Sequence, residues 1–172
     1  MPPSLPVSPS SDGAAEGAAR LSAEFLKASG AKQEELLEQL KQTKGAAYTS
    51  ALAAAIDQLS GPLKTKAREA LAERLARMTA ATLRDMVQDE MPEIRRAAAL
   101  ACAMKDEKEF IPDLAKLLED PQSAVVRAAY GALKALTGED FGPSPNASAE
   151  SRRRAASAYT EWWEKQSSKP PR

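Results

Sequence analysis

Apolar residues recur at fixed positions through the middle of the chain. Six columns of them repeat three times, with a spacing of 31 residues and without a gap. The columns are Leu52, Leu83 and Leu114; Ile56, Val87 and Leu118; Leu63, Ile94 and Val125; Ala67, Ala98 and Ala129; Ala70, Ala101 and Ala132; and Leu71, Cys102 and Leu133. A fixed internal period of this kind predicts a repeat architecture in which each unit packs on its neighbours.

Each unit is predicted to be a helical hairpin. In its second half the apolar residues fall at i, i+4, i+7 and i+8, which is one face of an α-helix. Prolines stand at the turns, in Gly61-Pro62, Met91-Pro92 and Asp120-Pro121, because the first turn of a helix tolerates a missing N–H. We predict first helices over 48–59, 79–89 and 108–119, and second helices over 62–77, 92–104 and 122–136.

Two segments of the second halves resemble a known repeat. Asp120 to Leu136 (DPQSAVVRAAYGALKAL) is similar to the second half of a HEAT repeat, and Asp89 to Met104 matches it position by position. Phe110 to Leu118 resembles the first helix of such a repeat. The resemblance implies an all-α fold, a right-handed solenoid of stacked helical hairpins of the HEAT, armadillo-like type.

This resemblance and the composition together give a domain organisation. The end of the chain resembles that of some bacterial HEAT-repeat proteins, in which a final aromatic helix closes the array. Tyr159, Trp162 and Trp163 lie at i, i+3 and i+4, so they share one helix face that would cover the last hairpin; the alternative is an exposed aromatic anchor for a partner. The predicted parts are a Pro/Ser-rich disordered tail over 1–12, HEAT-like repeats over 13–138 (a degenerate N-terminal hairpin over 14–43, then repeats over 48–78, 79–105 and 106–137), a loop over 139–148, a capping helix over 149–166 and a disordered tail over 167–172.

The resemblance further implies a structural ladder of aspartate and arginine along the turns. Asp89 and Asp120 share one column, and Arg96 and Arg127 share another, seven residues later in each unit. Gln58 and Thr65 occupy these columns in the first unit, so the ladder is expected to be incomplete there.

The composition argues against an enzyme. Histidine is absent, which removes the commonest general base and metal ligand. Cys102 is the only cysteine and falls within an apolar helical pattern, so it is expected to be a core residue. The glycines match no phosphate-binding loop. We therefore predict no catalytic residues, no metal site and no cofactor.

The sequence as given shows no secretory signal and no apolar stretch of the roughly 20 residues that a membrane span needs. We expect a soluble, cytoplasmic protein without membrane insertion. A trimmed form of an exported protein stays open, as does the oligomeric state.

Charge separates by helix type although the chain has a formal net charge of zero. The second-helix segments carry net positive charge and the first-helix segments net negative charge. Because second helices usually line the concave side of such an array, the inner face is expected to be basic. The candidate partner-binding residues are Lys64, Arg68, Arg95, Tyr130, Lys134, Arg152, Arg153 and Arg154.

Three functions compete on this evidence. The favoured one is a non-catalytic scaffold that binds a protein partner, of acidic character, through the basic concave face. The alternative is binding of nucleic acid or another phosphate backbone by the same face; the zero net charge and the absence of a nucleic-acid motif speak against it. An enzyme is the third, because some HEAT-like solenoids act as glycosylases or chromophore lyases, but their catalytic constellations have no counterpart here.

Overall fold

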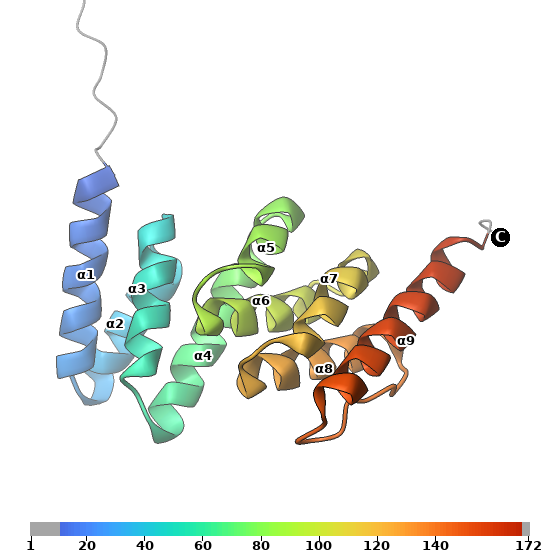
Figure 1. Cartoon of the computed structure of the whole chain (residues 1–172). Coiled ribbons are helices and arrows are strands. Elements are labelled where there is room, and N and C mark those ends of the chain that lie inside the picture. Colours follow the sequence, from blue (N-terminus) through green and yellow to red (C-terminus); the bar gives the residue numbers. More distant parts are fainter. Residues whose placement is uncertain (1–10, 170–172) are drawn as a thin grey trace, which may run out of the picture. The chain divides into compact units, whose positions relative to one another are not determined.

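The computed structural model describes residues 11–169, and these form helices and no strand (Figure 1). This confirms the predicted all-α class. Most of the predicted tails, 1–12 and 167–172, lies outside the described residues. Helix α1 begins at Ser11, with Asp12 in its first turn, where a negative charge faces the positive end of the helix dipole. Helix α9 ends at Ser167, so the helices take in the inner ends of both tails.

The helices fall into two compact units, Met1–Arg74 and Leu75–Arg172. The boundary lies within helix α4 (Gly61–Ala76) and therefore inside the predicted repeat 48–78 rather than in a turn between repeats. In a repeat array, neighbouring hairpins share one continuous core. A boundary between compact units can therefore fall inside a repeat.

The first unit is built from two hairpins. They comprise α1 (Ser11–Lys27) with α2 (Gly30–Gln42), and α3 (Ala46–Asp57) with α4. Helix α1 packs against α2 and α3, while polar contacts join α2 to α4. First helices therefore neighbour first helices, and second helices neighbour second helices.

The second unit repeats this arrangement and adds a final helix. Helix α6 packs along α8, and α5 contacts both α6 and α7. The first helix of the last hairpin, predicted to be continuous over 108–119, is divided by two short 3₁₀ segments that tighten its ends. The elements are α5 (Ala80–Val87), α6 (Pro92–Met104), η1 (Lys108–Phe110), α7 (Ile111–Lys116), η2 (Leu117–Glu119), α8 (Ser123–Thr137) and α9 (Ala149–Ser167).

The six apolar columns form the core. Every residue in them is buried except Leu63, which is half-buried. Between α6 and α8 the core consists largely of alanine, including Ala98, Ala101 and Ala129. Small side chains let two helices approach closely, which explains the high alanine content of the second helices.

Helix α9 closes the second unit on the side of the first helices. It packs mainly against α7 and η2, and so takes the place that the first helix of another hairpin would fill (Figure 1). Tyr159 is fully buried, as the predicted aromatic face requires, while Trp162 and Trp163 are only half-buried. The Tyr159 ring meets Phe141 edge-on at a centroid distance of 4.9 Å.

Candidate functional site

The predicted basic face is largely occupied by contacts within the protein. Arg95 is the clearest case. Its Nε and Nη2 donate to the two carboxylate oxygens of Asp120 at 2.7 and 3.1 Å, and its Nη1 donates to the carbonyls of Asp89 and Glu90. These bonds join the turns of two successive hairpins. Only 14% of the Arg95 side chain is exposed.

The arginine that pairs with an aspartate of the predicted ladder is therefore Arg95. The resemblance predicted that the aspartates pair with Arg96 and Arg127. In the structure, Asp120 accepts hydrogen bonds from Arg95 instead. Successive residues of a helix point about 100° apart, so Arg95 and Arg96 do not share one direction. Arg96 is half-buried and has a contact within the protein. The Arg127 side chain is exposed and has no partner among residues 11–169.

The aspartates of the ladder also hold their own turns. The Asp89 carboxylate accepts the backbone N–H of Met91, and that of Asp120 accepts the N–H of Gln122, each at 2.8 Å. These short loops order the chain just before the second helices begin. Both carboxylates therefore accept a hydrogen bond within their own turn.

Tyr130 and Lys134 are tied to one carboxylate. The Tyr130 hydroxyl donates to Asp140 at 2.8 Å, and Lys134 Nζ lies 2.9 Å from the same carboxylate. The hydrogen bond from Lys134, then that from Tyr130, lowers the pKa of Asp140, and the bond to Asp140 raises the pKa of Lys134. This cluster attaches the loop after α8 to the helix, and the carboxylate of Asp140 balances the positive charge of Lys134.

The three arginines that open α9 each have a partner. Arg152 Nη1 donates to the Asp120 carbonyl at 3.3 Å, so the cap is fastened to the end of the ladder. Arg153 lies 3.4 Å from Glu119, and Arg154 bonds Glu150 at 2.9 Å. The carboxylates offset the unfavourable effect of a basic first helical turn.

In the first unit, one basic residue of the second helices is buried. Arg74 donates to the carbonyls of Leu40, Lys41, Thr43 and Gly45, and to the Thr49 hydroxyl. These include the unpaired carbonyls at the end of α2, which favour a cation. Arg74 is a structural cap and contributes no charge to a binding surface.

The groove between α2 and α4 is not basic. Four glutamates line it, together with Lys41 and Lys66. Lys41 contacts Glu38 and Glu73, and Lys66 contacts Glu34 at 2.7 Å. Of the predicted contacts on α4, Lys64 and Arg68 are half-buried, and the Lys64 side chain has no partner within the described residues.

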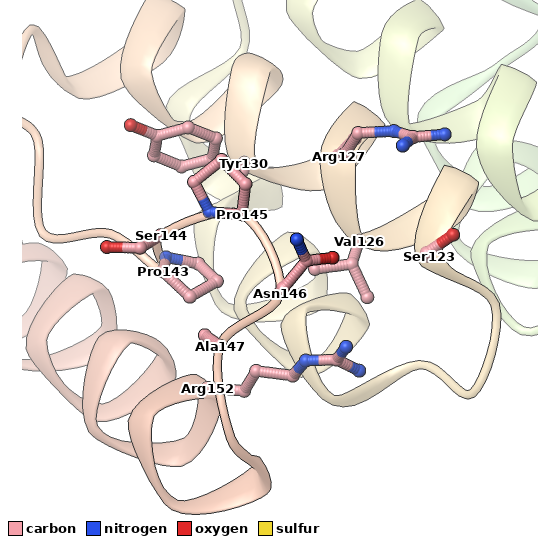
Figure 2. A pocket seen from close by; sticks show the side chains of 10 residues that line it. All are labelled: Ser123, Val126, Arg127, Tyr130, Pro143, Ser144, Pro145, Asn146, Ala147 and Arg152. Atoms are coloured by element: carbon pink, nitrogen blue, oxygen red, sulfur yellow. The ribbon is translucent and has the colours of Figure 1, made fainter.

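A small pocket lies beside α8 in the second unit (Figure 2). Its volume is about 100 Å³. The apolar lining comes from Val126 and the Tyr130 ring on α8 and from Pro143 and Pro145 in the loop. The exposed Arg127 and the half-buried Arg152 are among its lining residues, and no carboxylate lines it.

Cys102 is fully buried, and this burial raises the pKa of its thiol to about 12, so the reactive thiolate is scarce at neutral pH. Across the described residues, no group of three or more acidic or cysteine side chains converges as a metal site. Nor does any helix of this part have the length and apolar character to cross a bilayer.

Comparison with known families agrees with the hairpin arrangement. A family model described as HEAT repeats matches residues 34–134, more than half of the chain. The chain belongs to the HEAT-repeat family. HEAT repeats are generally protein-interaction scaffolds and are typically non-catalytic. No curated protein and no solved structure matches the sequence.

Two features of this HEAT-repeat chain escaped the sequence analysis. Arg74 follows Leu71 by three residues, so helical spacing already places it on the core face, and a charge there signals a buried cap. The sequence indicates the pocket more weakly, through the replacement of Arg95 by Val126 in one column of the repeats. Its loop residues, Pro143 and Pro145, are brought to α8 only by the tertiary fold.

Proposed function

We propose that this protein is a non-catalytic HEAT-repeat scaffold that binds an acidic segment of a partner protein through basic residues of its second helices. The observation that carries the proposal is Arg127. It is exposed on α8, has no partner among the described residues, and stands beside a pocket without carboxylates. A free guanidinium in such a place attracts a carboxylate at little desolvation cost.

The internal contacts narrow the set of residues that we propose for binding. Arg95 and Lys134 are engaged by Asp120 and Asp140, so their charges are largely compensated. In the second unit, Arg127 and Arg152 are the cations that line the pocket, with Tyr130 contributing its ring. In the first unit, Lys64 remains a candidate because no described side chain neutralises it. Arg68 lies one helical turn further along α4 and would add its charge there, although it already has a contact within the protein.

The test is binding of a labelled peptide made of alternating glutamate and glycine, followed by fluorescence anisotropy at low salt. We expect Arg127→Glu to weaken binding about fivefold, which corresponds to about 1 kcal/mol for one exposed charge. Lys116→Glu makes the same charge change on an exposed residue of α7 in the same unit and should leave the affinity unchanged. Equal effects of the two variants would exclude the second-helix face as the binding site.

The same assay separates this function from binding to nucleic acid. Labelled single-stranded RNA and duplex DNA take the place of the peptide, and the salt concentration is varied. A nucleic-acid binder would hold them with a steep salt dependence and ignore the acidic peptide. That result would overturn the proposed function.

A further inference from the structure

The pocket beside α8 lies where the arginine ladder ends. One column of the second helices contains Lys64, Arg95 and Val126. Arg95 uses its position to reach Asp120 of the following hairpin. After α8 the chain leaves the array through the loop that precedes α9, and the column carries a valine. An aliphatic side chain therefore stands where the preceding hairpin has a paired guanidinium.

Val126 gives the pocket an apolar floor. The residue is 7% exposed, and the Tyr130 ring, Pro143 and Pro145 extend the apolar lining around it (Figure 2). Tyr130 is fixed by its hydrogen bonds to Asp140, and Gly142 N–H donates to the same carboxylate, so both walls are held in place. A pocket that is ordered before binding costs little conformational entropy when a partner enters.

The size of the pocket decides what can enter it. Sites for small molecules and cofactors usually measure roughly 300–1,000 Å³, whereas this pocket measures about 100 Å³. It has room for one aliphatic side chain and not for a cofactor. A pocket of this size suits a single anchor side chain in a protein interface.

The charge around the pocket decides what must flank that side chain. Arg127 and Arg152 both line the pocket, and the remaining polar lining, from Ser123, Ser144 and Asn146, is uncharged. Arg152 uses Nη1 for the Asp120 carbonyl, and Arg127 makes no contact with a described side chain. Carboxylates on either side of an aliphatic anchor would complement this rim.

We propose that the pocket binds the side chain of a leucine in an acidic segment of a partner protein, with flanking carboxylates on Arg127 and Arg152. This inference rests on the proposed function and adds the anchor residue to it. The full chain is titrated with two labelled peptides of equal length and charge, both rich in glutamate, one with a central leucine and one with a central glycine. The leucine peptide should bind about tenfold more tightly, because burying this side chain removes apolar surface from water.

A variant that fills the pocket tests the location. Ala147 is a half-buried pocket residue in the loop, so Ala147→Leu should abolish the advantage of the leucine peptide while the glycine peptide binds as before. Ala149→Leu is the matched control, because Ala149 is exposed in the first turn of α9 and does not line this pocket. Circular dichroism verifies that both variants keep their helix content.

The outcomes separate the two proposals. If wild type binds both peptides equally and Arg127→Glu weakens both, the anchor pocket is refuted and the proposed function stands. If Ala147→Leu leaves the leucine advantage intact, the pocket is again not the binding site. If neither peptide binds, both proposals fall.

Discussion

Two arginines of the second helices show that a basic residue is available for binding only when its neighbours leave it free. Arg95 and Arg127 lie near the start of α6 and α8. The first makes four hydrogen bonds to carboxylate and carbonyl oxygens, while the second makes none with a described side chain. Charge counted along the sequence treats them as equal, although one is structural and the other is open to a partner.

This contrast predicts different effects on stability. Arg95→Met should lower the free energy of unfolding by about 2 kcal/mol, because it leaves the buried carboxylate of Asp120 without its cation. Arg127→Met should change it by less than about 0.5 kcal/mol, as is usual for a surface residue. Urea denaturation followed by circular dichroism measures both. Similar values for the two variants would mean that the Arg95–Asp120 pair adds nothing to stability.

At the scale of the elements, side chains from distant parts of the chain bind backbone groups at a helix end and in the turns between helices. Arg74 of α4 satisfies carbonyls at the end of α2, and Arg152 of α9 reaches the turn before α8. Tyr159 of α9 donates to the Glu139 carbonyl and accepts the Phe141 N–H, both at 3.3 Å. These bonds satisfy backbone groups that have no partner within a helix, and such groups are costly to bury without one.

Tyr159 should control the docking of α9. Tyr159→Ala removes a fully buried ring, which typically costs about 3 kcal/mol or more. The two tryptophans of the chain are Trp162 and Trp163, so their fluorescence reports on this helix alone. In the variant we expect the fluorescence change at a lower urea concentration than the loss of helical signal.

A change on the solvent side of α9 provides the control for this prediction. Glu161→Ala alters an exposed residue of the same helix, and its two transitions should stay as in wild type. Coincident transitions in Tyr159→Ala as well would contradict the view that this ring is the main attachment of the cap.

At the scale of the whole molecule, a HEAT-repeat chain has no single central core. Each hairpin buries the apolar face of its neighbours, so stability is close to a sum of local terms. Damage in one hairpin should therefore be felt mainly in the elements that it contacts. Zero net charge over the whole chain is compatible with local surfaces of either sign, as the glutamate-lined groove and the Arg127 pocket illustrate.

Arg74→Ala tests this locality. The substitution leaves several carbonyls around the end of α2 without a donor and should cost about 3 kcal/mol. Hydrogen exchange of the α2 and α3 amides should accelerate roughly a hundredfold, while that of α8 stays near the wild-type rate. Lys64→Ala, on the same helix but without a described partner, serves as the control. Equal acceleration in α8 would show that the chain unfolds as one cooperative body.

The hairpins and the core could be predicted from the amino-acid sequence alone. The columns spaced by 31 residues predict the positions of the helices and the residues that are buried. They can do so because apolar periodicity arises from the geometry of each helix and from its contact with the next hairpin. The burial of Tyr159 agrees with the aromatic face that its spacing predicts. The same columns marked the position where Arg95 gives way to Val126, without showing what surrounds it.

Which charges are free and where a pocket forms depend on contacts between residues far apart in the sequence. The bonds of Arg74, Arg95 and Lys134 join residues that the turns bring together, and their directions depend on helix rotation and on the path of the loop after α8. Hydrogen bonds and ion pairs act over a few ångströms, so a shift of one residue along a helix changes the partner. That is why the sequence could not show that Arg95 and Lys134 are paired within the protein while the side chain of Arg127 is exposed.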